Sequence, residues 1–291
     1  MVFIFLSILC ATSYFILQSY YLFHWSKTPN IIVPSTYKPK TPISIIIVVR
    51  NGEKIIEACI QSIFNQQYPT ELFELIIIDD RSEDETESIV KNFTNSSLRF
   101  FRLIDFPHCV HSPAFKKSGI ELGVHQANNE LIVVTDSDCT HHGDWLRTIS
   151  YTHSQYKSVF YTGPVQLKDN NKTLVKMQQM ENQALMLVTA AGMRSKLHDI
   201  ANGANMAFSK QAFQEVGGYQ GNYQYASGDD MFLIEKMRKR FPDKIRFIKA
   251  KTAIVWTEAK INWESLIKQR IRWSGKNKGL KNPAINWIWQ F

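Results

Sequence analysis

The sequence predicts an α/β protein whose central sheet is mostly parallel, flanked by helices and preceded by a membrane helix. Apolar runs of strand length alternate with helical patterns along the chain, as they do in such sheets. One run, Leu131–Val134, leads directly into the acidic triplet Asp136-Ser137-Asp138, and the first 26 residues contain no Asp, Glu, Lys or Arg. Because open α/β sheets bind ligands beyond the carboxyl ends of their strands, the triplet is placed to act on a ligand.

Residues 1–26 form the predicted membrane anchor, a single N-terminal span. At a rise of about 1.5 Å per residue, the stretch from Val2 to Phe23 is long enough to cross a bilayer. A cleaved signal peptide is the alternative, but the basic n-region and the small-residue cleavage site that it needs are missing. The first lysines follow the span, so the positive-inside rule places the remaining domain in the cytoplasm. A proline-containing linker is expected over residues 27–42.

Strands and helices alternate over the first half of the domain. The expected strands are Ile43–Val49, Leu75–Ile78, a short strand at 100–104, and the central strand that begins at Leu131. Between them, one helix presents an apolar face from Ile55 to Phe64, and another carries Lys116 and Lys117. This alternation predicts a parallel sheet with right-handed crossovers.

The second half of the domain is expected to add a strand and turn at 161–165 and a long helix over about 174–193. A further helix begins at the adjacent acids Asp229 and Asp230, after a Gly-containing turn. An acid at a helix start is often only a cap. Two adjacent acids in that position can also present a general base to an incoming hydroxyl group.

Acidic residues at the strand ends are the expected ligand-binding groups. Asp136 and Asp138 suit a hard cation, because Mg²⁺ or Mn²⁺ takes oxygen ligands from one or two carboxylates and from substrate phosphates. Asp80 follows the second strand, where a carboxylate binds a nucleotide base or ribose, or caps a turn. The chain has neither GxGxxG nor a P-loop, so a metal and basic side chains would have to neutralise bound phosphates.

The formal charge of +8 is concentrated at the C-terminal end. Residues 235–291 contain fifteen Lys or Arg and four acidic residues, without a nucleic-acid-binding motif. Several tryptophans are interleaved with these charges, so residues 276–291 are interpreted as a basic, aromatic tail at a membrane surface. A merely solvated basic segment is the alternative. Just before the tail, Gln269, Arg272 and Trp273 fall on about one helical face, where they suit a diphosphate and a sugar ring.

In chain order, these motifs resemble glycosyltransferase family 2, the inverting enzymes of the GT-A fold that use nucleotide-sugar donors. The resemblance covers roughly residues 42–275. Its motifs are the strand and N-E turn at Ser44–Glu53, the D-D-x-S turn at Asp79–Ser82, the K-x-x-A segment at Lys117–Ile120, the D-x-D at Asp136–Asp138, the N-x-A-F and G-G-Y region at Asn205–Tyr219, the E-D position at Asp229-Asp230, and the Q-x-x-R-W at Gln269–Trp273. The last motif is typical of membrane-associated members of the family.

The resemblance implies a Rossmann-like GT-A catalytic domain over residues 43–275, in which Asp138 binds Mg²⁺ or Mn²⁺ and Asp230 is the catalytic base. The implied donor-binding residues are Arg50, Glu53, Asp80, Lys117, Asp136, Gln269, Arg272 and Trp273, with Asp80 at the nucleobase and Lys117 near the phosphates. Asp229 stands where the family has Glu, so the sequence leaves open whether Asp229 or Asp230 is the base.

The function that follows is transfer of a sugar from a nucleotide-diphosphate donor to a hydroxyl acceptor, with inversion, at the cytoplasmic face of a membrane. The expected partners are the nucleotide sugar, a glycan or lipid-linked acceptor and the membrane, and no nucleic acid. Two other classes stay open. A nucleotidyltransferase of similar fold would also use strand-end acids and a metal, and a membrane-tethered binding module would keep the fold without catalysis.

Overall fold

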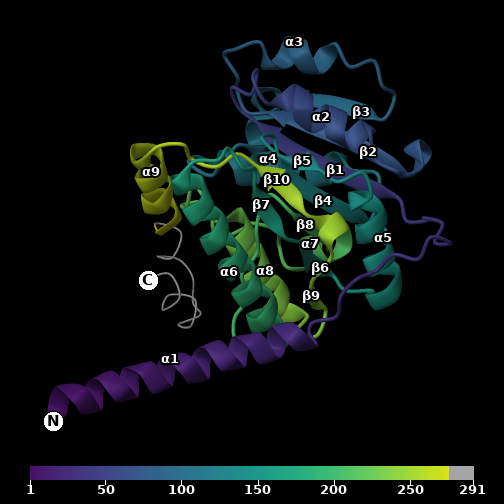
Figure 1. Cartoon of the computed structure of the whole chain (residues 1–291). Coiled ribbons are helices and arrows are strands. Elements are labelled where there is room, and N and C mark those ends of the chain that lie inside the picture. Colours follow the sequence, from purple (N-terminus) through teal and green to yellow (C-terminus); the bar gives the residue numbers. More distant parts are fainter. Residues whose placement is uncertain (275–291) are drawn as a thin grey trace.

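The structure is a computed structural model that describes residues 1–274, with side chains to residue 272. Its centre is a seven-stranded sheet of order β3-β2-β1-β4-β8-β6-β9 (Figure 1). β1 (Ile43–Val49) lies between β2 (Phe73–Asp79) and β4 (Leu131–Asp136), and β3 (Leu98–Arg102) borders β2; all four are parallel. The tail predicted for residues 276–291 lies outside the described residues.

The other side of the sheet is mixed. β8 (Met206–Ser209) pairs antiparallel with both β4 and β6 (Phe160–Thr162), and β9 (Ile245–Phe247) is parallel to β6. A second sheet of order β5-β10-β7 consists of β5 (Thr140–His141), β7 (Val165–Leu167) and β10 (Val255–Thr257). The predicted mostly parallel α/β sheet is thus confirmed. The short strand expected at 100–104 is found two residues earlier, because Leu103–Asp105 forms a 3₁₀ turn.

Apolar side chains on both faces explain why the sheet is central. In β2 every residue is buried, and in β1 all but one, as expected for strands covered on both sides. One face packs against α2 (Ile56–Phe64), α3 (Thr86–Lys91) and α5 (Trp145–Tyr156). The other packs against α4 (Phe115–Gln126), α6 (Thr173–Ser195), α7 (Lys210–Glu215) and α8 (Asp229–Arg240). Further 3₁₀ turns lie at Thr70–Leu72, Pro107–Cys109 and Lys251–Ala253.

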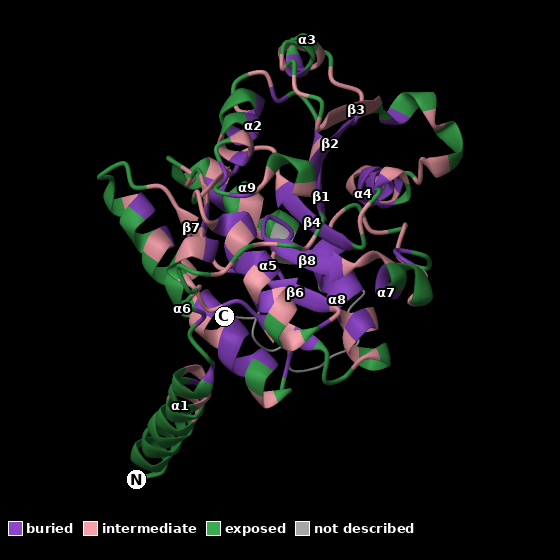
Figure 2. Cartoon of the chain, turned by 90° about the vertical axis from the view of Figure 1, so that its right-hand side faces the viewer, coloured by how far each residue is buried: buried purple, intermediate pink, exposed green. Residues whose placement is uncertain are grey.

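Two helices stand apart from this core. α1 (Val2–Lys27) is 26 residues long, and its length and apolar composition are sufficient for it to cross a membrane. It projects from the domain with an exposed surface except near its last turns, which pack against α6 (Figure 2). α9 (Trp263–Ser274) lies beside α6, joined to it by the ion pair between Arg270 and Glu181.

Candidate active site

A pocket of about 580 Å³ is the candidate active site. It opens at the carboxyl end of β4 and is walled by α6, α8 and α9. Four aspartates line it: Asp136 and Asp138 from the end of β4, and Asp229 and Asp230 from the start of α8. The structure therefore brings together two acidic motifs that lie about ninety residues apart in the sequence.

Lys116 links these two acidic motifs. Its Nζ lies 2.7 Å from Asp136 Oδ1 and 3.2 Å from Asp229 Oδ2. Burial alone would lower the pKa of this ammonium group, but the carboxylates of Asp136 and Asp229 raise it above the usual value for lysine. The side chain stays charged at neutral pH and ties the end of β4 to the first turn of α8.

Asp230, at the start of α8, accepts hydrogen bonds from two backbone amides. Its Oδ1 accepts a hydrogen bond from Met231 N at 2.8 Å, and its Oδ2 accepts one from Gly203 N at 3.2 Å. A Cβ on residue 203 would lie 2.8 Å from Asp229 Oδ2 and 3.2 Å from Lys116 Nζ. Glycine at 203 is therefore what allows the loop before β8 to approach the acids so closely.

A buried histidine supports the strand that carries the Asp136-Ser137-Asp138 triplet. His141 Nδ1 lies 2.8 Å from Ser62 Oγ, and its Nε2 lies 2.9 Å from Thr135 Oγ1, immediately before Asp136. Burial lowers the pKa of His141 to about 3, so the ring is neutral and bridges α2 and β4 without charge. Nothing in the sequence singled this residue out, although its place three residues after Asp138 is a usable signal.

The predicted nucleoside-binding residues lie at the neighbouring strand ends. Asp80 continues β2 beside β1, and its amide donates a hydrogen bond to Val49 O at 2.7 Å. Its carboxylate Oδ1 is 2.9 Å from Arg81 Nε, and the Arg81 guanidinium stacks 3.8 Å above the Phe115 ring. Asp80 is thus on the same edge of the sheet as the acidic pocket, two strands away from β4, but does not line that pocket.

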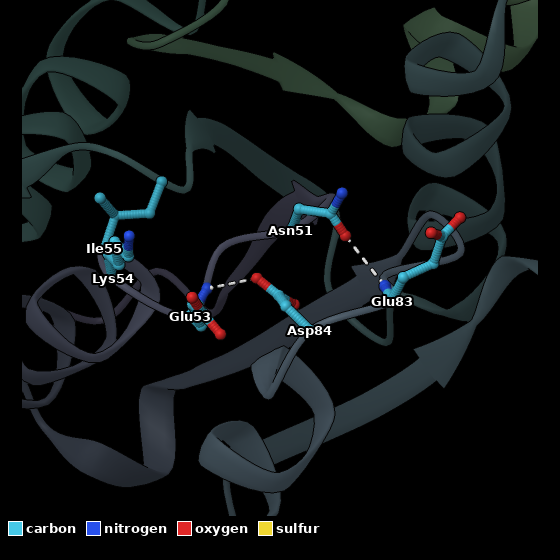
Figure 3. Close-up of a pocket in the computed structure, with 6 residues that line it drawn as sticks. All are labelled: Asn51, Glu53, Lys54, Ile55, Glu83 and Asp84. Carbon is cyan, nitrogen blue, oxygen red and sulfur yellow. Dashed lines mark hydrogen bonds between the residues drawn. The ribbon is translucent and has the colours of Figure 1, made fainter.

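Glu53 lines a second pocket of about 430 Å³ between the turn after β1 and the turn before α3 (Figure 3). Hydrogen bonds join these turns: among them, Glu53 N donates to Asp84 Oδ2 at 3.0 Å, and Glu83 N donates to Asn51 Oδ1 at 2.9 Å. Ile55 lines both pockets, so the two adjoin. Arg50 is exposed at the end of β1 and lines neither.

Lys117 is not in the position that the motif implies. Its side chain is fully buried, outside the lining of both pockets, and its Nζ donates to the carbonyl oxygens of Tyr225 and Ser227 at 2.5 and 2.8 Å. Adjacent residues of a helix point about 100° apart. The preceding residue, Lys116, is therefore the one that faces the acids, while Lys117 anchors the loop before α8.

α9 contributes the remaining predicted residues. Gln269 and Arg272 line the acidic pocket, and Arg270 does so while bound to Glu181 of α6. The side chain of Trp273 lies outside the described residues. Gln178 of α6 fixes the chain just before α9. Its side-chain amide forms two hydrogen bonds with the backbone of Lys260, at 2.8 and 3.2 Å.

The pocket aspartates suit a metal ion that binds together with a phosphate-containing substrate. Among residues 1–274, no three His, Cys, Asp or Glu side chains are grouped closely enough to hold an ion by themselves. Asp138 nevertheless presents a partly exposed carboxylate to the pocket. Mg²⁺ and Mn²⁺ are often bound by one or two carboxylates together with substrate phosphates and water. The donor set therefore suits an ion shared with a diphosphate.

Known proteins share both the sequence pattern and the fold. Probable glycosyltransferase YdaM of Bacillus subtilis is 25% identical over 240 residues, covering 81% of this chain and 55% of the relative. Poly-β-1,6-N-acetyl-D-glucosamine synthase of Staphylococcus epidermidis is 24% identical over 267 residues, covering 90% of this chain and 61% of the relative. The chain thus spans little more than half the length of these relatives.

Among solved structures, the mannosyltransferase PcManGT of Pyrobaculum calidifontis, in complex with GDP-Man and Mn²⁺, superposes with a TM-score of 0.65 at 20% sequence identity. The match covers 91% of this chain and 70% of that one. The family profile "Glycosyl transferase family 2" matches residues 44–217, from β1 to the turn after α7. The chain therefore belongs to glycosyl transferase family 2 and has the GT-A fold.

Proposed function

We propose that the protein transfers a sugar from a nucleoside-diphosphate donor to a hydroxyl acceptor, with inversion at the anomeric carbon. The observation that carries the proposal is the ion-paired cluster of Asp136, Lys116 and Asp229, in a pocket that also contains Asp138 and Asp230. It supplies carboxylates for a metal and a base, and a cation for phosphate, at the edge where such sheets bind ligands.

The donor would extend over the two adjoining pockets. Its nucleoside would lie at the ends of β1 and β2, near Glu53 and Asp80, and its diphosphate would lie toward Asp138. A bound Mg²⁺ or Mn²⁺, held by Asp138 and the diphosphate, would stabilise the negative charge on the leaving group. Lys116 and Arg272 would add positive charge from the protein itself.

Asp230 is the proposed base. Asp229 is ion-paired with Lys116, whereas Asp230 is oriented by amide hydrogen bonds from Gly203 and Met231. In this role Asp230 accepts the proton of the acceptor hydroxyl as that oxygen attacks the anomeric carbon on the face opposite the leaving diphosphate. General-base assistance of this kind contributes about 10²–10⁴-fold to the rate.

A lipid-linked or membrane-bound glycan is the proposed acceptor, and the cytoplasmic face of the membrane the proposed location. Trp263, Ile267 and Ile271 form an exposed stripe at i, i+4 and i+8 along α9. The exposed Met180 lies on neighbouring α6. Figure 1 shows both helices on the side of the molecule toward which α1 extends, so this apolar face would meet the bilayer that α1 enters.

Product analysis tests the proposal. With UDP-GlcNAc and GDP-mannose in turn, plus Mn²⁺ and membrane vesicles, we expect release of a nucleoside diphosphate and transfer of labelled sugar to a lipid or glycan fraction. Release of pyrophosphate would instead identify a nucleotidyltransferase. If neither donor, nor any other nucleotide sugar, is turned over or bound, the protein is a binding module for a different ligand.

The choice of base is tested by matched substitutions. Asp230→Asn should lower sugar transfer by about 10²-fold or more while nucleoside-diphosphate binding survives, because only proton removal is lost. Asp229→Asn should weaken the link to Lys116 and cost less. Near-normal transfer by Asp230→Asn, together with an inactive Asp229→Asn, would reverse the assignment.

A further inference from the structure

The last turns of α1 pack against the catalytic domain. Most of α1 is exposed, but Tyr21 is 5% exposed and lies against the domain. The ammonium group of Lys249 lies 3.9 Å over the Trp25 ring and donates a hydrogen bond to Trp25 O at 2.8 Å. Beyond the helix, Ile31 N donates to Lys249 O at 2.9 Å. The last turns of α1 are therefore bound to the domain by side-chain contacts, in addition to the covalent connection through residues 28–42.

Tyr21 covers the buried side chain of His198. The Tyr21 hydroxyl lies 3.1 Å from His198 Nε2, and the imidazole is 1% exposed. The ring packs directly on Gly192 of α6, where a Cβ would lie 2.0 to 2.5 Å from ring atoms. His198 Nδ1 is buried without a hydrogen-bond partner among the described residues. Since burial lowers the pKa of His198 to about 4, the ring is neutral and depends on Tyr21 for a hydrogen bond.

His198 also begins the segment that forms one wall of the active-site pocket. Residues 200–204 line the pocket, and Gly203 donates its amide hydrogen to Asp230. The intervening Asp199 binds Arg238 of α8 through both carboxylate oxygens, at 2.6 and 2.7 Å. Contacts thus connect the last turns of α1 to His198, at the start of segment 198–204. Near the other end of this segment, Gly203 contacts Asp230.

We propose that the Tyr21–His198 hydrogen bond makes the membrane helix a positioning element of the active site. His198 is the positioning residue: by fixing the start of the 198–204 segment, it sets the place of the Gly203 amide and so of the Asp230 carboxylate. This inference rests on the proposed function for its catalytic consequence, but the structural coupling can be measured separately. Without the contact, α1 would only tether the domain.

Two measurements on the full chain in phosphatidylcholine vesicles test the coupling. In Tyr21→Phe, which removes only the hydroxyl, we expect amide exchange of residues 198–204 to accelerate about tenfold. With UDP-GlcNAc or GDP-mannose and Mn²⁺, kcat should fall about tenfold while the donor KM stays unchanged, because the donor is seated at β1 and β2. Gly192→Ala, which displaces the imidazole, should reproduce both effects.

Controls separate positioning from loss of fold. Tyr20→Phe alters the neighbouring, more exposed tyrosine and should change neither measurement. His198→Gln keeps a hydrogen-bonding amide for Tyr21 and should stay near the wild-type values, whereas His198→Leu should match Tyr21→Phe. Binding of UDP or GDP with Mn²⁺, measured by calorimetry, gives the folded fraction of each variant and corrects kcat for it.

The proposal is overturned if Tyr21→Phe has the same amide exchange in residues 198–204 and the same kcat as Tyr20→Phe. It is also overturned if kcat falls as much in His198→Gln as in His198→Leu. Failure of the proposed function looks different. In that case the wild type turns over no nucleotide sugar, while the change in amide exchange on Tyr21→Phe still decides whether the membrane helix holds the segment.

Discussion

Two adjacent lysines in α4 have different roles because they point in different directions. Lys116 bridges Asp136 and Asp229 in the pocket, whereas Lys117 is buried under the loop before α8 and bonds to its carbonyl oxygens. A sequence motif locates the pair but not which member faces the site, because the choice depends on the rotation of the helix about its axis. The family pattern pointed to Lys117, and the geometry assigns the pocket to Lys116.

Substitution of the two lysines separates these roles. Lys116→Met should lower turnover by about 10²-fold, since it removes positive charge near the diphosphate and leaves two carboxylates without their shared cation. Lys117→Met should instead lower the free energy of unfolding by about 2 kcal/mol through lost hydrogen bonds to a charged group. Kinetics and chemical denaturation of both variants check this. An inactive Lys117→Met of normal stability, beside an active Lys116→Met, would contradict the assignment.

Two buried histidines make the stability of the domain depend on pH. Burial lowers the pKa of His141 to about 3 and of His198 to about 4, below the value of about 6.5 in the unfolded chain. The unfolded state therefore binds more protons below pH 6.5. Stability from these groups is complete above that pH and falls toward pH 4, by up to about 1.4 kcal/mol per pH unit for each histidine.

Denaturation at pH 7.5, 6.0 and 5.0 measures this slope. His141→Asn should flatten it, because its titration is removed. His125→Asn, at an exposed position of α4, is the matched control and should leave the slope as it is in the wild type. Equal slopes in all three proteins would show that His141 is protonated in the folded state.

At the scale of elements, strands with long apolar runs were predictable and the shortest strands were not. β1, β2 and β4 are six or seven residues long and almost fully buried, so composition alone indicated them. β5, β7 and β10 have two or three residues each, too few for a periodic pattern. β8 inserts antiparallel beside β4, a pairing set by tertiary contacts that the residues of β8 do not encode.

The helices show the same distinction between local pattern and long-range contact. The acids at the start of α8 were predictable from the turn before them, but the amide of Gly203 that orients Asp230 was not. Likewise, the apolar composition of α1 indicates a membrane helix, while its contact with His198 joins residues 177 positions apart. Such pairs have no signal in a single sequence.

The packing of α4 on β1 provides a test at this scale. A Cβ on Gly123 would lie 2.6 Å from Ile46 Cγ2, in the middle of the sheet. Gly123→Ala should therefore lower the free energy of unfolding by about 1–3 kcal/mol through overpacking. Gly143→Ala, where the nearest atom would be 3.8 Å away, is the control and should be neutral within about 0.5 kcal/mol. A stable Gly123→Ala would show that α4 is less tightly packed.

At the scale of the whole molecule, the site lies between two parts with different roles. The first strands and the turns after them form the edge at which the proposed donor would bind. α6, α8 and α9 form the opposite wall, and the last turns of α1 pack against the same α6. The proposed acceptor would thus reach the acids from the side of the molecule toward which α1 extends.

Calorimetric titration of UDP and GDP, with and without Mn²⁺, tests the central claim that these acids converge on a metal and an activated sugar. We expect one nucleotide-binding site whose affinity depends on Mn²⁺, and an affinity at least about tenfold lower in Asp138→Asn because the ion loses its protein ligand. Asp169→Asn, at an exposed position, should bind like the wild type. Binding that needs no metal, or that is equally tight in Asp138→Asn, would contradict the claim.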